Sequence, residues 1–260
     1  MGPRPFEIVC EIEPATTPDL TRVRHQIGVL APVASSFLIP DNHIGRATVS
    51  SVAVAHEVQA MGGRAVACLN ARDRNLLGFE RDLLTAAAYG VDQFLFVYGD
   101  KPTAGGRTSE LTVRSMVELA RAAATARPFA GAGSFRVGAA TGLRPVPAWK
   151  RDADFLFAQV SFSIDRLLAW RETFDDGLDV YAGVMVVESA GMARRLAVSA
   201  PDIDIPAALV AAVDSDPDAG VDAALEMVDA IEASDAFAGV HLVPVSRYRQ
   251  VAARLEARHG

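Results

Sequence analysis

Residues 66–102 read VACLNARDRNLLGFERDLLTAAAYGVDQFLFVYGDKP, and this stretch decides the fold. Two short apolar segments, residues 65–69 and 94–98, each end abruptly in polar residues. Between them, apolar residues recur at helical spacing until Gly90. The pattern predicts a strand, a helix and a second strand. Parallel α/β folds place their ligand sites at the carboxyl ends of such strands.

The same alternation of strand and helix continues along the whole chain. Strands are expected at residues 8–13, 35–39, 65–69, 94–98, 136–140, 155–159, 180–186 and 240–243. Helices are expected at about 19–31, 48–61, 75–88, 109–126, 163–174, 188–198 and 246–258, with two more at about 206–213 and 218–233. Near-continuous apolar strands are typical of parallel sheets buried on both faces. Eight of them predict an α/β fold, a (β/α)8 TIM barrel formed by residues 1–260 as one domain, with an open doubly wound sheet as the alternative.

The connection between the fifth and sixth strands is unusually short. It consists of TGLRPVPAWKRDAD, residues 141–154, and contains Pro145 and Pro147. A parallel crossover normally needs a dozen or more residues including its helix, so at most one or two helical turns fit near residues 147–152. Such a gap would expose apolar barrel surface, which a second copy of the chain could cover as a homodimer.

Composition and charge exclude several classes of function. The chain has 260 residues, half of them hydrophobic, and a net charge of −7. An acidic chain of this kind is not expected to bind nucleic acid, and no apolar run is long enough to cross a membrane. Cys10 and Cys68 lie in apolar strands and are expected to be buried core residues, and no spacing of His or Cys predicts a metal site. We therefore expect a soluble, cytoplasmic protein.

Three polar side chains lie in or just after expected strands that are largely apolar: Glu11 in the first strand, Asp100 after the fourth and Gln159 at the end of the sixth. Glu11 alternates with Glu13, so the two should share the inward side of the first strand with Glu7 and Val9. A carboxyl group in a packed interior favours its protonated form, which suits a general acid. The less specific readings are a solvated strand end for the glutamates, a turn or helix cap for Asp100, and a structural hydrogen bond for Gln159.

Other polar residues lie at the same end of the predicted barrel. Asn70, Arg72 and Asp73 follow the third strand, and His241 lies on the last. Arg72 and Asp73 could form a local ion pair that holds the loop, and His241 could be a hydrogen-bonded core histidine. The sequence does not decide between these structural roles and a role in ligand binding.

Several motifs, taken in order, resemble the methylenetetrahydrofolate reductase family over nearly the whole chain. VCEIEPA (residues 9–15) resembles the FEFFPP-like first strand of that family through Glu11, and Tyr98-Gly99-Asp100 resembles its RGD or TGD turn. Ala158-Gln159 resembles its TQ pair, with Phe162 where an aromatic residue follows. Further segments with the same resemblance are Asp41-Asn42 with Arg46, GVMVVES (183–189), DIPAALVAAV (204–213) and GVHLVPVSRY (239–248).

The resemblance implies a TIM barrel that reduces 5,10-methylenetetrahydrofolate to 5-methyltetrahydrofolate with hydride from NADH or NADPH. It implies that Glu11 donates the proton that opens the imidazolidine ring at N10. Asp100 would stabilise the resulting 5-iminium cation, and Gln159 would bind the pterin edge. The remaining candidate positions for binding substrate or cofactor are Asn70, Asp73, Tyr98, Gly99, Phe162 and His241.

The chain also departs from the flavin-containing members of the family. Cys68 stands where those members have the histidine of an HLTC motif, and Ser163 stands where they have an aspartate. TGLRPVPAWK replaces their YPE…H segment and the helix that grips FAD, with Lys150 as the one remnant of a basic pair. These departures argue against FAD as a cofactor and resemble the flavin-independent actinobacterial type.

Three other functions remain open on the same barrel: an FAD-dependent reductase, an enzyme acting on another pterin or one-carbon substrate, and a non-catalytic pterin-binding subunit. Three polar groups that converge on one pocket favour an enzyme over the last of these.

Overall fold

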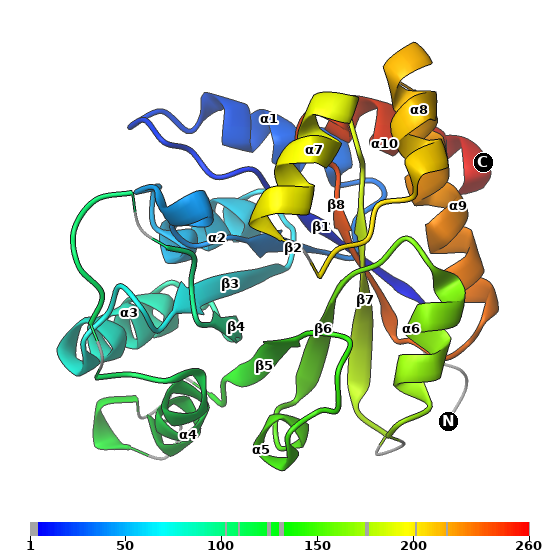
Figure 1. The fold of residues 1–260 in the computed structure, drawn as a ribbon. Helices are drawn as coiled ribbons and strands as arrows, with labels where there is room; N and C mark the ends of the chain where they lie inside the picture. Colours follow the sequence, from blue (N-terminus) through cyan, green and yellow to red (C-terminus); the bar gives the residue numbers. More distant parts are fainter. Residues whose placement is uncertain are drawn as a thin grey trace.

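The computed structural model is a closed barrel of eight parallel strands surrounded by helices (Figure 1). It describes residues 5–101, 103–108, 110–123, 126–129, 133–174, 177–200, 202–216 and 218–259. The strands are β1 (Glu7–Glu11), β2 (Ser36–Ile39), β3 (Ala65–Asn70), β4 (Gln93–Val97), β5 (Arg136–Thr141), β6 (Phe155–Val160), β7 (Asp179–Met185) and β8 (Gly239–Val243). They follow one another around the barrel in chain order, and β8 pairs with β1 to close it. The predicted (β/α)8 TIM barrel is confirmed.

The helices follow their strands as the sequence predicts. They are α1 (Thr21–Leu30), α2 (Ser51–Ala60), α3 (Leu76–Ala88), α4 (Val113–Ala123), α5 (Ala148–Arg151), α6 (Ile164–Arg171), α7 (Ala190–Ser199), α8 (Ala207–Ser215), α9 (Ala219–Ala233) and α10 (Tyr248–His259). The helix expected at 109–126 is seen as α4, while residues 109, 124 and 125 lie outside the described residues. The first strand ends at Glu11, two residues earlier than expected, so Glu13 lies in the loop and pairs with Arg22.

Local sequence explains where individual helices begin. Asn75 caps α3 by accepting a hydrogen bond from the Gly78 backbone N–H at 2.8 Å. Phe79, Leu83 and Ala86 form the buried face of the same helix. Ser163 and Ser189 cap α6 and α7 in the same way.

The core has two layers, one on each side of the sheet. Alternate strand residues fill the barrel interior, and this set comprises Val9, Leu38, Val66, Cys68, Leu95, Phe155, Phe157 and Tyr181. The intervening strand residues, Cys10 among them, pack outward against the helices. Both cysteines are buried and free, as expected. Burial of both strand faces is the physical reason that the strands have near-continuous apolar sequences.

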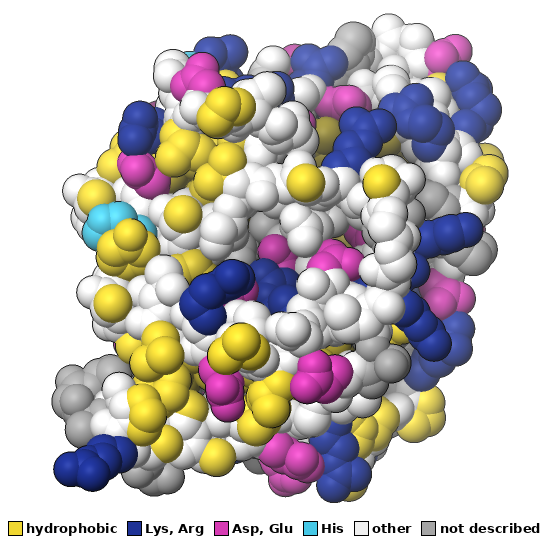
Figure 2. Space-filling view, turned by 90° about the vertical axis from the view of Figure 1, so that its left-hand side faces the viewer, with side chains coloured by type: hydrophobic (Ala, Val, Ile, Leu, Met, Phe, Trp, Pro, Cys, Tyr) yellow, Lys and Arg dark blue, Asp and Glu magenta, His cyan; other side chains and the backbone are white. Residues whose placement is uncertain are grey.

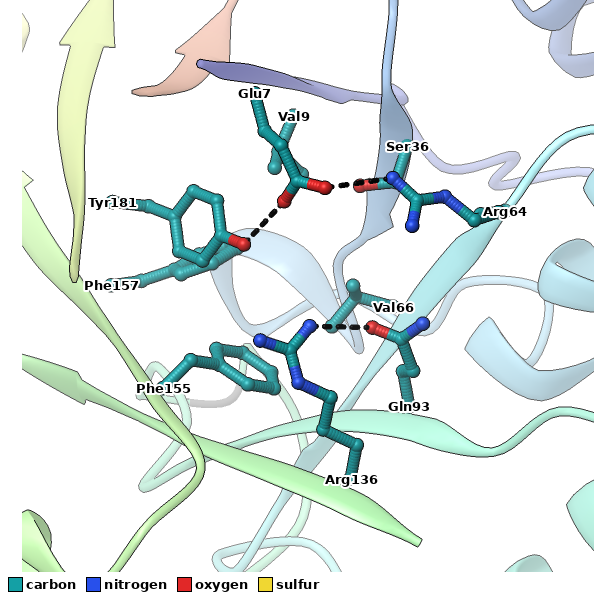
Figure 3. Close-up of a pocket in the computed structure, with 10 residues that line it drawn as sticks. All are labelled: Glu7, Val9, Ser36, Arg64, Val66, Gln93, Arg136, Phe155, Phe157 and Tyr181. Carbon is teal, nitrogen blue, oxygen red and sulfur yellow. Dashed lines mark hydrogen bonds and ion pairs between the residues drawn. The ribbon is translucent and has the colours of Figure 1, made fainter. Parts of the chain in front are cut away.

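The amino-terminal end of the barrel is closed by polar side chains (Figure 3). Glu7 accepts hydrogen bonds from the Tyr181 hydroxyl at 2.5 Å and from Arg64 at 2.9 Å. Arg136 pairs with Asp179 at 2.6 Å on the same floor. Glu7 and Val9 line this interior, so the inward face predicted for the first strand is confirmed for them.

The short fifth connection contains a single helical turn, α5, as the prolines predict. The apolar surface expected to be bare there is covered by the connection itself. Val146 is buried, Leu143 packs on the core, and the Trp170 indole N–H donates to the Arg144 carbonyl at 2.8 Å. The large hydrophobic side chains that are exposed within the described residues lie elsewhere, at Ile44, Met61, Leu77, Leu84, Tyr89, Tyr98 and Val198. The local reason for expecting a homodimer at this connection is therefore removed.

No helix within the described part of the chain is long and apolar enough to cross a membrane.

Candidate active site

The candidate site lies at the carboxyl-terminal mouth of the barrel, where the loops that follow the strands meet. The face shown in Figure 2 carries the loops after β2 and β4, and basic and acidic side chains lie together near its middle. The predicted residues fall into three groups on this mouth. One group lies at the seam where β8 closes on β1, the second lies on β3 and the loops after β2, β3 and β4, and the third lies at the end of β6.

Glu11 and His241 form the first group. A Glu11 carboxylate oxygen lies 3.0 Å from His241 Nε2, and the two side chains are only 16% and 13% exposed. The imidazole stacks on the Phe157 ring, with centroids 5.2 Å apart and planes inclined by 24°. A half-buried carboxyl group that is bonded to an imidazole can hold and transfer a proton, which is the chemistry expected of a general acid.

Cys68 lies in the barrel interior beneath this pair. Burial raises the pKa of its thiol well above the ordinary value, and the nearby charges of Glu11 and Asp41 raise it further. The thiol therefore stays protonated and uncharged at neutral pH, which leaves the interior below Glu11 apolar. The position at which the family resemblance would place a histidine thus holds a small neutral side chain.

The second group is built around Asn70, which is fully buried at the end of β3. Its Nδ2 donates to Asp41 at 2.6 Å, and its Oδ1 accepts from the Asp73 backbone N–H at 2.9 Å. Asp41 also pairs with Arg74, which in turn bonds Asp82 at 2.8 Å. Both polar ends of the Asn70 amide are thus engaged within the protein, and Asn70 holds the loop rather than facing the mouth.

Asp73 is exposed and accepts a hydrogen bond from the Asn42 amide at 3.1 Å. The ion pair that the sequence suggested between Arg72 and Asp73 is not seen among the described residues. The arginine that is paired is Arg74, which lies two positions further along, with Asp41 and Asp82. The loops after β2 and β3 are therefore joined by Asn42–Asp73 at the surface and by Asp41–Arg74 beneath it.

Asp100 lies on the loop after β4, and its carboxylate accepts the backbone N–H of Ile44 at 2.9 Å. Ile44 has a positive φ of 57° and is 63% exposed. A β-branched residue in this region of φ/ψ space is strained, and such strain persists only where surrounding contacts hold it. The hydrogen bonds that hold it include the one to Asp100 and those from the Thr103 N–H and hydroxyl to the Gly45 carbonyl.

Gly99 gives the turn before Asp100 its shape. Its φ is +97°, and a Cβ at this position would lie 2.9 Å from Asn70 Cβ. Only glycine meets both requirements without displacement of its neighbour. Tyr98, immediately before it, is 49% exposed, and its hydroxyl accepts a hydrogen bond from Arg107 at 2.8 Å.

Gln159 and Phe162 belong to the end of β6 and the loop that follows. Gln159 is exposed, and its side-chain oxygen accepts the Val160 backbone N–H at 2.9 Å. Phe162 packs on a cluster formed by Val187, Ala193 and Val213. Gln159 can thus offer its amide N–H groups to a ligand, whereas the Phe162 ring is directed into protein contacts.

Lys150, on α5, is the one basic residue retained from the segment that the resemblance associates with FAD. Burial lowers the pKa of its amine, and Nζ donates to the Ala140 carbonyl at 2.5 Å. The helix has a single turn, and the amine is already bonded to the barrel backbone. Together they are poorly suited to bind the phosphates of a flavin dinucleotide.

In the described chain, no cluster of three or more His, Cys, Asp or Glu side chains could hold a metal ion.

Fold and site together define a class of protein: a parallel (β/α)8 barrel with a carboxylate–histidine pair at the end where barrel enzymes bind their substrates. Residues 149–257 of the chain match the profile of methylenetetrahydrofolate reductase. The resemblance drawn from the motifs is thereby confirmed over this part of the chain, which contains Gln159, Phe162 and His241. No curated protein matches the sequence.

Several solved structures share the fold over nearly the whole chain. An uncharacterized protein from Clostridium thermocellum that binds two copies of 5-methyl-5,6,7,8-tetrahydrofolic acid has a TM-score of 0.64 at 8% identity, covering 98% of this chain and 97% of that one. Apo-MsnO8 has a TM-score of 0.57 at 15% identity, covering 97% and 96%. A β-1,3-glucanosyltransferase from Rhizomucor miehei has a TM-score of 0.51 at 10% identity, covering 92% and 87%. Identities this low show a shared barrel and not a shared activity.

The sequence did not single out two features of the site. The stacking of Phe157 on His241 depends on the barrel interior, and no local motif marks it. The pair of Asp41 and Arg74 joins residues 33 positions apart. Its one visible signal was a charged residue in the loop after each of two apolar strands.

Proposed function

We propose that this protein reduces 5,10-methylenetetrahydrofolate to 5-methyltetrahydrofolate, taking hydride directly from NADH or NADPH without a flavin. The observation that carries the proposal is the Glu11–His241 pair at the mouth of the barrel. The family match over residues 149–257 supports the oxidoreductase class. The binding of 5-methyltetrahydrofolic acid by a protein of the same fold supports a folate ligand.

In this proposal the protonated Glu11 carboxyl donates its proton to N10 of the substrate, and the bond between N10 and the bridging methylene carbon breaks. The product of this step is a cationic 5-iminium group. Hydride from the nicotinamide then adds to the methylene carbon, which gives the 5-methyl group and NAD(P)+. His241 orients the carboxyl group and returns a proton to it, so that one proton and one hydride are consumed per turnover.

The other candidate residues would act on the cation and the pterin. The negative charge of Asp100, which is exposed on the loop after β4, stabilises the iminium group where positive charge develops. The amide of Gln159 binds the pterin edge. Support for direct hydride transfer comes from the one-turn helix α5 and from the engagement of Lys150 with Ala140, because both weaken the grip on a flavin.

The first test is anaerobic oxidation of NADH or NADPH by methylenetetrahydrofolate with protein whose absorption spectrum shows no flavin. We expect turnover without added FAD. Turnover that requires FAD would make the protein a flavin enzyme. No turnover with either nucleotide, with or without FAD, would indicate another pterin substrate or a protein that only binds folate.

The test of the acid is Glu11→Gln, which retains the size of the side chain and removes its proton. Loss of a general acid lowers kcat by about 10²- to 10⁴-fold. Glu13→Gln is the matched control, because Glu13 is two positions away and pairs with Arg22 outside the site. Equal activity of Glu11→Gln and Glu13→Gln would refute the role given to Glu11, even if the reduction itself takes place.

A further inference from the structure

Arg72 lies at the rim of the mouth, directly after β3, and no acidic partner for it is seen in the described chain. Its backbone N–H donates to the Tyr98 carbonyl at 3.1 Å, and its carbonyl accepts from the Thr108 N–H at 2.9 Å. The main chain of Arg72 is therefore fixed between two segments of the loop after β4. Its side-chain Nε is buried without a hydrogen-bond partner. A buried donor without a partner is unusual in a protein and indicates a group that a ligand would satisfy.

Arg107 approaches the same place from the loop after β4. It is exposed, and its Nη1 donates to the Tyr98 hydroxyl at 2.8 Å. Thr108, the next residue, is the one that bonds the Arg72 carbonyl. Arg72 and Arg107 are thus both bonded to Tyr98, Arg72 through its backbone N–H and Arg107 through its guanidinium group.

These two arginines differ from Arg74 and Arg22, which have acidic partners at the same end of the barrel. Arg74 is paired with Asp41 and Asp82, and Arg22 is paired with Glu13. Neither Arg72 nor Arg107 has a carboxylate partner within the part of the chain that the structure describes. Their positive charge is not neutralised, although the chain as a whole carries a net charge of −7.

The position of the two arginines relative to Glu11 and His241 follows from the topology. In a closed ring of eight strands in chain order, β4 lies opposite β8. Arg72, which follows β3, and Arg107, in the loop after β4, therefore lie on the β3–β4 side of the ring, away from the seam between β8 and β1 that holds the acid pair. A ligand that presents its reacting end to Glu11 can extend its other end toward them.

We propose that Arg72 and Arg107 form an anion subsite on the β3–β4 side of the mouth, which binds a phosphate or carboxylate group of a ligand whose reacting end lies at Glu11 and His241. Guanidinium groups suit this role because their planar N–H donors match the oxygens of phosphate and carboxylate. The subsite deepens the proposed reduction and rests on it for the identity of the ligand. The two candidate sources are the diphosphate of the hydride donor and the glutamyl carboxylates of the folate.

The test measures binding without catalysis. Two probes are titrated by calorimetry into the full-length protein: ADP-ribose, which has the diphosphate but no nicotinamide, and 5-methyltetrahydrofolate, which has the glutamyl carboxylates. The variants are Arg107→Gln and Arg72→Gln. Arg114→Gln is the control, because Arg114 is an exposed residue of α4 whose ion pair is with Glu118.

We expect one of the two probes to bind about 10- to 100-fold more weakly to both variants, which is the range for a lost charge-assisted hydrogen bond, and to bind the control as it binds the wild type. Weaker ADP-ribose binding identifies the subsite with phosphate, and weaker folate binding identifies it with carboxylate. Unchanged affinity of both probes for both variants overturns the proposal, and so does failure of both probes to bind the wild type. Since Arg107 is exposed, its variant tests the proposal even if Arg72→Gln does not fold.

The same proteins separate this inference from the proposed reduction. Arginine-dependent binding without any turnover would support the anion subsite and refute the proposed reduction. If the protein turns over and the variants have the same KM values for both substrates as the wild type, the reduction is supported and the subsite is refuted.

Discussion

At the scale of single residues, the site contains positions where any other residue would change the local geometry. Gly99 is the clearest case because two independent requirements meet there. Its backbone has a positive φ, and the side chain of Asn70 occupies the space where a Cβ would be. The turn before Asp100 and the buried amide of β3 are thus shaped together.

We expect Gly99→Ala to lower the free energy of unfolding by about 2 to 3 kcal/mol, since it adds a steric clash to an unfavourable φ. The measurement is urea denaturation monitored by circular dichroism. Gly105→Ala is the matched control, because Gly105 has a φ of +80° with nothing within 4 Å of the added Cβ. The control should lose only about 1 kcal/mol. Equal losses for the two variants would show that the contact with Asn70 has no energetic effect.

At the scale of elements, the loops that follow β2 and β3 are held together by buried charges. The Arg74 side chain is 12% exposed, and that of its partner Asp41 is 4% exposed. Burial alone would lower the pKa of Arg74, but the hydrogen bonds and charges of Asp41 and Asp82 raise it above its ordinary value. The guanidinium is therefore charged, and it needs these partners.

Removal of one partner of a buried pair leaves an uncompensated charge, which is strongly destabilising. We expect Asp41→Asn to reduce the free energy of unfolding by about 3 kcal/mol, at the low end of the usual range because Arg74 keeps Asp82. Asp202→Asn removes a comparable pair with Arg144 whose side chains are 76% and 68% exposed, and it should reduce stability by less than about 1 kcal/mol. Equal effects in chemical denaturation would contradict a structural role for the buried pair.

At the scale of the whole molecule, the two ends of the barrel have different tasks. The carboxyl-terminal mouth carries the candidate site, and the amino-terminal floor joins strands that are distant in the sequence (Figure 3). Glu7 of β1 bonds Tyr181 of β7, and it also bonds Arg64, which lies directly before β3. Residues at this end of a barrel serve stability rather than catalysis.

The floor makes stability depend on pH. Burial alone would raise the pKa of Glu7, but the hydrogen bonds from Tyr181 and Arg64, with the charges of Arg64 and Arg136, bring it below the ordinary value of 4.5. The ionised form is thus favoured in the folded state. Its contribution is fully present above the unfolded-state value and is lost as the pH falls through the lowered one.

We expect Glu7→Gln to lower the free energy of unfolding by about 1 to 2 kcal/mol at pH 7, with a smaller difference from wild type as the pH falls below 4.5. Denaturation curves from pH 7 to pH 3 measure the effect. The proposed reduction should continue in this variant at neutral pH, because Glu7 lies at the opposite end of the barrel from Glu11. A difference in stability that is constant with pH would show that Glu7 is not ionised in the folded protein.

Several features of this protein were determined by the sequence alone. The eight strands, the order of the helices and the single turn of α5 follow from local apolar patterning and from proline, because these act over a few residues. The predicted positions of Glu11 on the first strand and His241 on the last strand follow for the same reason. Periodicity also correctly predicted that Glu7 and Val9 face the interior.

Other features were decided only by the tertiary structure, because they depend on contacts between residues far apart in the chain. Closure of the barrel brings β8 beside β1, and this places His241 against Glu11 across 230 positions. Asn70 was predicted as a ligand-binding residue, but Asp41 and the Asp73 backbone N–H engage its amide within the protein. The early end of β1 turned Glu13 outward toward Arg22. In each case the deciding quantity was the distance between side chains on different strands, which depends on how the barrel closes and is not encoded in any local stretch of sequence.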